Sequence, residues 1–329
     1  MKQELLLHKL YEAKDYLSGE ELCRQLGISR TGVWKMIRSL REAGYDIEAR
    51  TNLGYRLRSA PDALTAEEIG WRLPQRDGQL LRCFPLIDST NTYLKQQALL
   101  NAADSTVAVA NQQSGGRGRR ERSFQSPAGK GLYLSVLWRP GLAPESVLSL
   151  TGMAAVAVCD AIEEVCALRP GIKWTNDLLL NGKKICGILT EMALEGETGA
   201  IQYVVVGIGI NVHQTAEDFT PEVAAMATSL SEQLGYPVSR PALAAALIRR
   251  LDQLRGALAR PHDDYLQRYR RDCLTLGQPV QLLWKEEKRL ATAVDMDEQF
   301  GLVVEYPDGS RETVRSGEVS VRGLYGYAP

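Results

Sequence analysis

The sequence lacks several features that would assign a chain to a class at once. Its 329 residues include six cysteines but no C-x-x-C pair, which argues against a zinc ribbon and leaves no disulfide framework for a chain of this length. No stretch approaches the ~20 uncharged apolar residues of a membrane span. The N-terminus has an amphipathic pattern broken by charges rather than a secretory signal. We therefore expect a cytoplasmic protein that does not enter a membrane, with cysteines that serve as buried small hydrophobes.

Charge of one sign is also missing, because the formal net charge is only -1. No global electrostatic field therefore marks the chain as a nucleic-acid binder, and any basic surface must be local. Residues 1–60 hold 11 Lys and Arg against 8 Asp and Glu, a net of +3, which leaves -4 on the remainder. The chain is long enough for one sizeable core and one or two small satellite domains.

The first of these domains, residues 1–60, begins with the pattern of two helices joined by a tight turn. Ser18 and Glu21 have the spacing of a capping box, and the short helix that follows runs through Leu26 to a turn at Gly27. A second helix is expected from about Arg30 to Ala43, ending at a left-handed cap on Gly44. Its buried face has apolar residues at helical spacing, namely Val33, Ile37 and Leu40.

The other face of the second helix is basic, and a hairpin pattern follows it. "DIEARTNLGYRLRS" predicts two short strands around residues 52–54, which form a β wing. Two helices, a basic face and a wing resemble a winged helix-turn-helix domain that binds DNA, with Arg30, Lys35 and Arg38 as the expected contacts. The alternative is a small helical adaptor whose arginines only form a solvated face.

A linker over residues 59–68 leads to a second domain, residues 64–268, in which strand and helix patterns do not alternate strictly. This arrangement favours an α+β domain with a mixed or mostly antiparallel sheet. The expected strands are 80–84, 107–110, 132–138, 185–192 and 203–210, and the expected long helices are 148–165 and 241–258. Short alternating strands with the turn "YPDGS" then predict a small β-barrel over residues 273–329.

The stretch "GGRGRRERSF", Gly115 to Phe124, is the densest concentration of unusual residues, with three glycines and four arginines in ten positions. Glycine lets backbone N–H groups approach a ligand closely, and arginine adds forked donors that match carboxylates and phosphates. The composition is suited to binding an anion.

Three other stretches of this domain carry polar residues beside strands. "IDSTNTYL" places polar residues between a strand and a helix, which is also the pattern of an N-cap. In "IKWTNDLLLNGKKICGIL", a hairpin at "NGKK" accounts for Asn181 and Gly182 but not for the polar residues around Trp174. "VVVGIGINVH" is an apolar strand with Gly207 and Gly209, and a lone G-x-G is weak evidence of function.

Taken together, "GRGRR", "KWTNDL", "KKICGIL" and "GIGINV", in this order behind a winged helix, closely resemble the bacterial bifunctional biotin–protein ligases that also repress the biotin operon. The resemblance covers essentially the whole chain, including "SGEVSVRG" near the C-terminus. It implies a central domain like that of class II synthetases and a C-terminal SH3-like barrel. It also implies an enzyme that uses ATP and Mg²⁺ to form biotinyl-5′-AMP and then biotinylates a lysine of a biotin carboxyl carrier protein. Operator DNA and a homodimer promoted by biotinyl-5′-AMP are the other implied partners.

The resemblance also assigns roles to individual residues. Lys184, Arg119 and Asp177 are the implied catalytic residues, and Asp177 is also the implied metal ligand. The implied biotin contacts are Ser89, Thr90, Asn91, Gln113, Arg117, Gly118, Arg119 and Lys184. The implied ATP contacts are Arg122, Phe124, Asn176 and Asn211. One departure from the family pattern is Thr175, which replaces the usual proline of the K-W-P-N-D motif.

Three other functions compete with this interpretation. A lipoate–protein ligase shares "SGG" in its site loop, although "KWTNDL", "GRGRR" and the winged helix favour biotin. A transcription regulator that only senses a metabolite is disfavoured by the presence of Lys184 with Arg117 and Arg119. An RNA binder would need a longer Arg/Gly tract with stacking aromatic residues.

Overall fold

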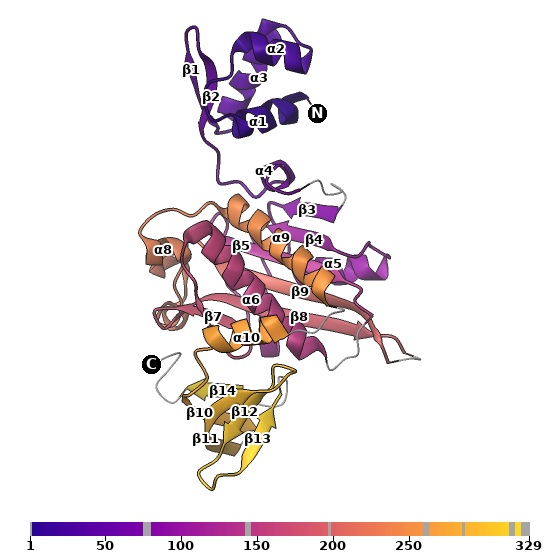
Figure 1. The fold of residues 1–329 in the computed structure, drawn as a ribbon, viewed down its shortest axis with the longest axis vertical. Coiled ribbons are helices and arrows are strands. Elements are labelled where there is room, and N and C mark those ends of the chain that lie inside the picture. The colour runs from indigo at the N-terminus through magenta and orange to yellow at the C-terminus, as the bar shows by residue number, and fades with distance from the viewer. Residues whose placement is uncertain are drawn as a thin grey trace. The chain divides into compact units, whose positions relative to one another are not determined.

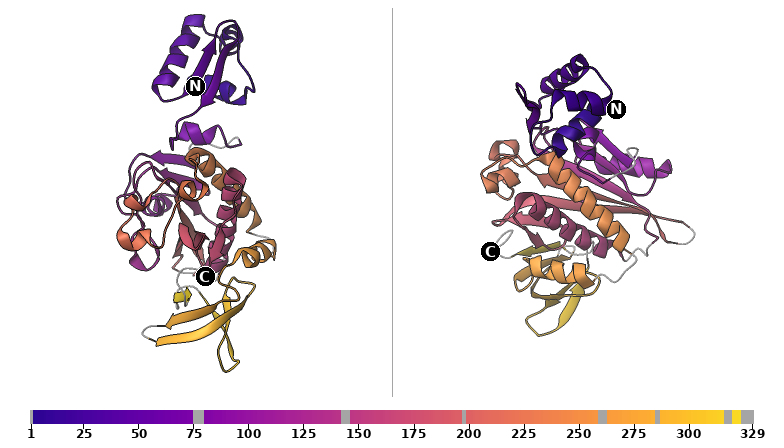
Figure 2. Two further views of the ribbon diagram at one scale, coloured as in Figure 1. Left: turned by 90° about the vertical axis from the view of Figure 1, so that its left-hand side faces the viewer. Right: turned by 45° about the horizontal axis from the view of Figure 1, so that its top comes forward.

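The computed structural model describes residues 2–74, 80–141, 146–196, 199–258, 263–284, 287–315 and 320–323. The chain divides into two compact units, Met1–Ala63 and Leu64–Pro329, which are described separately (Figures 1 and 2).

The first unit has the two helices and the hairpin that the sequence predicts, preceded by a further helix. Its elements are α1 (Lys2–Glu12), α2 (Gly19–Leu26), α3 (Arg30–Glu42), β1 (Asp46–Arg50) and β2 (Gly54–Ser59). Ser18 caps α2 by accepting a hydrogen bond from the Glu21 N–H at 3.1 Å, and Gly27 has a φ of 60°. The two strands pair as an antiparallel wing. The buried face of α3 packs with α1, α2 and the wing in one core, as the spacing of its apolar residues predicts.

The second unit contains a seven-stranded sheet in the order β3-β4-β5-β9-β8-β7-β6. The strands are β3 (Leu81–Phe84), β4 (Thr106–Ala110), β5 (Gly131–Trp138), β6 (Gly171–Lys173), β7 (Asp177–Leu180), β8 (Lys183–Leu194) and β9 (Ile201–Asn211). The pairing of β3 with β4 is parallel and the other pairings are antiparallel, so the predicted mixed sheet is confirmed. The hairpin predicted at "NGKK" joins β7 to β8, whereas β6 was not predicted because it is too short to show a period.

The two faces of this sheet are covered by different helices. The long helices α6 (Val147–Cys166) and α9 (Arg240–Ala257) share the main core with Leu132, Leu134 and Val136 of β5 (Figure 1). The helix α5 (Thr90–Leu99) packs against the other face, in a core with Leu137 and Val205. Since side chains alternate along a strand, Tyr133 and Ser135 face the α5 side.

One shorter helix lies partly inside the predicted linker, and another crosses the predicted end of the second domain. The helix α4 (Ala66–Gly70) begins inside the stretch predicted as a linker, because Thr65 caps it by accepting from the Glu68 N–H at 3.1 Å. The helix α10 (Asp263–Asp272) runs past residue 268, the predicted domain end. Two further short helices, α7 (Pro221–Ala224) and α8 (Leu230–Leu234), precede α9.

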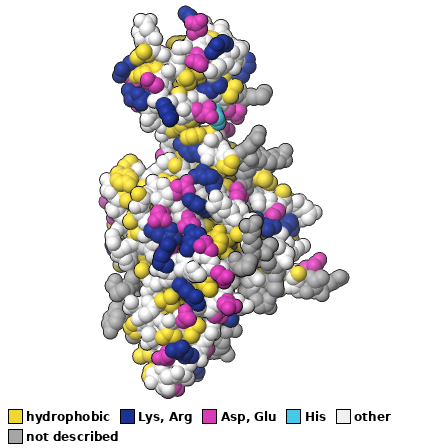
Figure 3. Space-filling model, in the orientation of Figure 1, with side chains coloured by type: hydrophobic (Ala, Val, Ile, Leu, Met, Phe, Trp, Pro, Cys, Tyr) yellow, Lys and Arg dark blue, Asp and Glu magenta, His cyan; other side chains and the backbone are white. Residues whose placement is uncertain are grey.

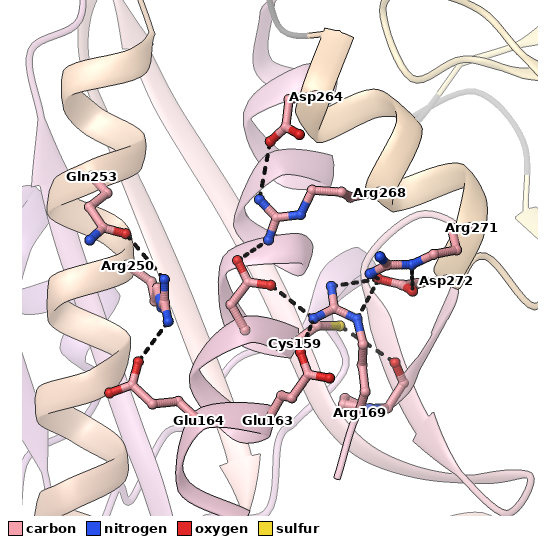
Figure 4. A network of polar contacts seen from close by, with 12 residues as sticks. Cys159, Glu163, Glu164, Arg169, Arg250, Gln253, Asp264, Arg268, Arg271 and Asp272 are labelled. Atoms are coloured by element: carbon pink, nitrogen blue, oxygen red, sulfur yellow. Dashed lines mark hydrogen bonds and ion pairs between the residues drawn. The ribbon is translucent and has the colours of Figure 1, made fainter. Parts of the chain in front are cut away.

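A network of ion pairs holds α10 against α6. Arg169 lies 2.9 Å from Asp160 and 2.6 Å from Asp272, and Arg268 bonds the other oxygen of Asp160 (Figure 4). Acidic and basic side chains interleave over this helical face (Figure 3). The charges thus compensate one another locally, in agreement with the small net charge of the chain.

The C-terminal part forms an antiparallel sheet in the order β13-β12-β11-β10-β14. Its strands are β10 (Pro279–Trp284), β11 (Glu287–Met296), β12 (Leu302–Glu305), β13 (Arg311–Val314) and β14 (Ser320–Gly323). The predicted "YPDGS" turn connects β12 to β13. Closure into a barrel remains a prediction, and residues 316–319 of "SGEVSVRG" lie outside the described residues.

Phe300 connects this sheet to the rest of the second unit. Its carbonyl accepts a hydrogen bond from Trp174 Nε1 at 2.9 Å, and its ring packs edge-on against Tyr269 at 5.4 Å. A Cβ on Gly152 of α6 would lie 2.3 Å from the Phe300 ring, so glycine is needed at this position for the ring to fit. The Tyr269 hydroxyl donates to the Thr175 carbonyl at 3.1 Å, which anchors the turn between β6 and β7.

The sequence predicts that the cysteines are buried and that no segment spans a membrane. Four of the six cysteines are buried, two are partly buried and all are free. No helix in the described ranges is long and apolar enough to cross a membrane.

Candidate active site

Two neighbouring rows of residues across the central strands form the floor of a pocket on the α5 side of the sheet. In the first row, Ser135 of β5 pairs with Gly207 of β9, which pairs with Leu189 of β8. In the second row, Tyr133 pairs with Gly209, which pairs with Gly187. The two rows are two residues apart along each strand, a separation of ~7 Å at about 3.4 Å per residue.

Asn91 lies across the first row. A Cβ on Gly207 would be 2.0 Å from Asn91 Oδ1, so only glycine leaves room for the side chain. Ser135 Oγ lies 2.6 Å from Asn91 Oδ1, and Asn91 Nδ2 donates to the Leu189 carbonyl and to Glu191 at 3.3 and 2.9 Å. Both N–H groups of the Asn91 amide are therefore used within the protein.

Phe124 lies across the second row. A Cβ on Gly209 would be 2.6 Å from its ring, and a Cβ on Gly187 would be 3.6 Å from it. Tyr133 packs edge-on against the same ring at 6.4 Å between centroids. The two glycines of "GIGI" thus give space to side chains from two distant segments, which is a function that the isolated motif does not reveal.

The arginine–glycine loop folds back on itself beside these rows. The Gly118 N–H donates to the Arg122 carbonyl at 2.7 Å, and the Phe124 N–H donates to the Gly116 carbonyl at 2.9 Å. A Cβ on Gly116 would lie 2.3 Å from the Phe124 carbonyl oxygen, so the close approach of the two strands of the loop requires glycine there. Arg119 of the loop is partly buried, whereas Arg120 and Arg122 are exposed.

Cations and amides meet at one end of the pocket. Lys184 Nζ lies 2.6 Å from Asp177 Oδ1, and Arg119 Nη1 donates to Asn176 Oδ1 at 2.7 Å. Asn176 Nδ2 donates to Asp177 and to the Ile188 carbonyl at 3.2 and 3.0 Å, which fixes the amide with its oxygen toward Arg119. Burial lowers the pKa of Arg119, and the Asp177 charge opposes that shift.

A chain of oriented hydrogen bonds lines the other end. Gln113 Oε1 accepts from the Thr90 N–H at 2.9 Å and from the Thr90 hydroxyl at 3.2 Å. Gln113 Nε2 donates to Ser126 Oγ at 3.0 Å, which leaves its second N–H for a ligand. Ser89 caps α5 by accepting from the Thr92 N–H at 3.4 Å. The N-cap interpretation of "IDSTNTYL" is therefore correct, and the same residues also line the pocket.

Glu191 joins this end of the pocket to the arginine loop. It lies 2.7 Å from Lys95 Nζ and 3.8 Å from Arg117 Nη1, and it accepts the bond from Asn91. Burial raises the pKa of Glu191, but the hydrogen bonds from Lys95 and Asn91 outweigh burial and set the pKa below its ordinary value. A charged Glu191 therefore faces Arg117.

Comparison with known proteins relates this geometry to a family. The biotin/lipoate A/B protein ligase family model matches residues 83–211, an HTH domain matches residues 2–56, and the biotin protein ligase C-terminal domain matches residues 275–322. The chain is 38% identical over 273 residues to the bifunctional ligase/repressor BirA of Bacillus subtilis, covering 82% of this chain and 79% of that protein. It is 33% identical over 313 residues to the Escherichia coli protein of the same name, covering 94% of each.

The chain belongs to the biotin protein ligase family. The structure also resembles that of the Aquifex aeolicus biotin protein ligase in complex with biotin and ATP, with a TM-score of 0.64 and 30% identity over 74% of this chain and 98% of the other. The match to biotin ligases over most of the chain places it with these enzymes rather than with lipoate ligases.

In this biotin protein ligase, most of the residues expected at the site line one pocket. Those that do are Ser89, Thr90, Asn91, Gln113, Arg117, Gly118, Arg119, Phe124, Asn176 and Lys184. Arg122, Asp177 and Asn211 are not among its lining residues. Asp177 instead accompanies Lys184, and Arg122 is exposed at the base of the loop.

Asn211 is in a supporting position. Its Nδ2 donates to the Thr228 carbonyl at 3.0 Å, and its Oδ1 accepts from Gln214 at 3.3 Å. The Thr228 N–H in turn donates to the Lys184 carbonyl at 2.9 Å. The side chain predicted to contact ATP therefore braces the segment that pairs with the backbone of Lys184.

Sequence reasoning missed several residues of this biotin protein ligase's pocket. Tyr133 lines the pocket, and Ser135 donates a hydrogen bond to Thr90, which also lines it. Both residues belong to β5, where the side chains on both faces of the sheet are buried, so the sequence shows no alternation of polar and apolar residues. Glu191 follows "KKICGIL" closely in sequence. Its lone charge at the end of an apolar strand was the one signal by which the sequence could have indicated it.

The three residues expected to contact DNA all lie on the exposed side of α3. Arg30 and Lys35 have no ion-pair partner among the residues that the structure describes, whereas Arg38 Nε lies 2.9 Å from Glu42. Arg41 donates to the Ile47 carbonyl at 3.0 Å and thus ties α3 to the wing.

Proposed function

We propose that this chain is a bifunctional enzyme that forms biotinyl-5′-AMP from biotin and ATP, transfers the biotinyl group to a lysine of a biotin carboxyl carrier protein, and represses transcription by binding operator DNA. The observation that carries the ligase half is the pair of cations, Arg119 and Lys184, held by Asn176 and Asp177 at one end of a pocket whose other end is lined by oriented hydrogen-bonding groups. Membership of the biotin protein ligase family supports both halves.

The polarity of the pocket suggests how biotin would lie. The fused ring, with a ureido carbonyl and two N–H groups, finds complementary groups in Ser89, Thr90 and Gln113 at the first row. The acid chain would extend over the ~7 Å between the rows. Its carboxylate then lies at the second row, where Lys184 Nζ would be 3.1 Å from a Cβ on Gly187.

Adenylation requires two anions to meet, since a carboxylate oxygen attacks the α-phosphorus of ATP and pyrophosphate leaves. Fixed positive charge in a partly buried site lowers this electrostatic barrier more effectively than a strong base would. Arg119 and Lys184 supply that charge, and in the described conformation Asn176 and Asp177 hold them at the same end of the pocket. Phe124 would pack beside the adenylate. In the second step, the carrier amine attacks the biotinyl carbonyl carbon and AMP leaves.

Asp177 is suited to assist the second step. The amine of a free lysine has a pKa near 10.4 and must lose a proton before it attacks. Asp177 is the only carboxylate that the described contacts place on the Lys184 ammonium, and it is the candidate base. Arg122, exposed at the end of the loop, would reach the departing phosphates.

Mg²⁺ would bind to this enzyme together with its substrate ATP. The described residues include no group of three or more His, Cys, Asp or Glu side chains that could hold a metal ion. Magnesium usually retains waters and binds through phosphates with one or two carboxylates. Mg²⁺ would therefore arrive with ATP, and Asp177 would be its carboxylate ligand from the protein.

Ligand control of repression would act through assembly. We infer that biotinyl-5′-AMP promotes a homodimer, which binds a two-fold operator more tightly than a monomer does. Coupling of this kind is reciprocal, so operator DNA must tighten the apparent binding of the adenylate.

Transfer of biotin tests the ligase half directly. The full chain is incubated with biotin, MgATP and a purified biotin carboxyl carrier domain, and the carrier lysine is examined by mass spectrometry. The expected product is the singly biotinylated carrier, and a carrier with its acceptor Lys changed to Arg is the control. A parallel reaction supplies lipoate, MgATP and a lipoyl domain, and lipoylation there without biotinylation of the biotin carrier would reject the assignment.

A further inference from the structure

An exposed tryptophan stands out on the helix that carries the DNA-binding residues. Trp34 lies on α3 and is 51% exposed, while Val33 and Ile37 on the same helix are each 1% exposed. An indole buries a large apolar area when it is covered, so leaving one in water forgoes that stabilisation. The exposed indole is therefore available to a partner, and its neighbours show which kind of partner would suit it.

The surroundings of Trp34 are cationic. Arg30 and Arg38 flank it at i-4 and i+4, and Lys35 follows it. Arg38 Cζ lies 5.8 Å from the centre of the indole ring. Glu42 offsets only Arg38, at 2.9 Å, in a pair that is exposed on both sides and so contributes little stability.

These neighbours decide between two kinds of partner. A hydrophobic protein surface would cover the indole but leave Arg30 and Lys35 without counter-charges. Duplex DNA supplies phosphates for the cations and, in the major groove, one apolar group on its base edges, the thymine 5-methyl. The groove admits an α-helix, and the N-terminal half of such a helix, which includes Trp34, meets the bases.

We propose that Trp34 is a specificity-determining residue that packs against a thymine methyl of the operator, with Arg38 stacked beside the indole to hold its orientation. This inference rests on the proposed DNA-binding function and deepens it. Arg30 and Lys35 contribute charge, which is insensitive to sequence when it meets phosphate. The contact of Trp34 with the thymine methyl adds a preference for an A·T pair at one position of the operator.

The experiment removes the methyl and nothing else. The full chain, with biotin and MgATP, first selects its preferred site from a library of random duplexes. Each thymine of the selected site is then replaced by deoxyuridine, and binding is measured by fluorescence anisotropy. For the unmodified protein, one replacement should weaken binding about fourfold, the equivalent of ~0.8 kcal/mol for one buried methyl.

Variants assign that effect to Trp34. Trp34→Ala should bind the parent duplex at least fourfold more weakly and be indifferent to the same replacement, while Trp34→Phe should keep part of the sensitivity. Leu5→Ala is the matched control, because Leu5 is 44% exposed on α1 of the same unit, and it should keep both affinity and sensitivity. Circular dichroism melting and carrier biotinylation check that each variant is folded.

Each other outcome overturns a distinct claim. If the protein selects a site but tolerates every deoxyuridine, or if Trp34→Ala keeps the full sensitivity, the inference about Trp34 is wrong and the repressor assignment survives. If no sequence is enriched at all, the repressor half of the proposed function fails, and the role of Trp34 fails with it.

Discussion

The side chain of Asn91 occupies the space that a Cβ on Gly207 would need, with 2.0 Å between that position and Asn91 Oδ1. Gly207→Ala should therefore displace Asn91 and the start of α5, which carries Ser89 and Thr90. Overpacking of this kind costs about 1–3 kcal/mol, so we expect the KM for biotin to rise tenfold or more. Steady-state kinetics with biotin as the varied substrate would measure it.

Gly209→Ala is the matched change in the second row. It places a methyl 2.6 Å from the Phe124 ring and leaves the contacts of Asn91 in place. We expect the KM for ATP to rise more than the KM for biotin, the reverse of the Gly207→Ala pattern. If both variants affect the two substrates alike, the separation of the pocket into a biotin end and a nucleotide end is wrong.

Removal of the positive charge of Lys184 or Arg119 should weaken the binding of biotinyl-5′-AMP more than the binding of biotin. Lys184→Ala and Arg119→Ala each remove a charged donor from the site of the developing anion, which is worth ~3 kcal/mol or roughly a hundredfold. Calorimetry with biotin and with biotinyl-5′-AMP measures both affinities. Equal weakening of the two ligands would place these residues at the ureido ring instead.

The arginine loop should become ordered by its ligand. The loop carries four arginines and three glycines within ten residues, a composition that is self-repelling and entropically costly to fix. Trypsin should therefore cut after Arg117 to Arg122 quickly in the ligand-free protein and slowly with biotinyl-5′-AMP. Equal cleavage rates, followed by mass spectrometry, would rule out ordering by the ligand.

The ion-pair network on α10 predicts a loss of stability in acid. Burial raises the pKa of Asp272, which is 8% exposed, but hydrogen bonds from Arg271 and Arg169 outweigh burial and set its pKa below the ordinary value (Figure 4). A lowered folded-state pKa stabilises the fold above the unfolded value, near 3.9, and this stabilisation disappears as pH falls through the folded value.

The melting temperature of Asp272→Asn should accordingly lie below that of the parent at pH 7, and the difference should shrink below about pH 4. The control is Asp264→Asn, whose carboxylate is 77% exposed and pairs with Arg268 at 3.3 Å, and which should melt like the parent. A constant difference between parent and Asp272→Asn down to pH 3 would show that the charge of Asp272 is not the cause.

The sequence predicted the first unit well because its signals are local. The cap at Ser18, the turn at Gly27 and the spacing of Val33 and Ile37 each act within a few residues. The predicted linker, residues 59–68, contains the division between the two units at Ala63, but the sequence did not predict the short helix α4, which depends on a cap at Thr65.

The pocket could be predicted only as a set of motifs. The role of Gly207 and Gly209 depends on the register of the sheet, which pairs them with Ser135 and Tyr133. It also places them under side chains from distant segments, Asn91 and Phe124. No single-segment pattern contains that information. Asn211 lies one row further along β9, where its amide is bonded to Thr228 and Gln214, and its contact with ATP stays a prediction.

Exchange of labelled pyrophosphate into ATP tests the central claim, that this pocket adenylates biotin, most directly. The full chain is supplied with MgATP, labelled pyrophosphate, and biotin, lipoate or neither. We expect rapid exchange with biotin, none above background with lipoate or without acid, and a loss of roughly a hundredfold for Lys184→Ala. Exchange that needs lipoate, or no exchange with biotin from a folded protein that binds it, would contradict the account.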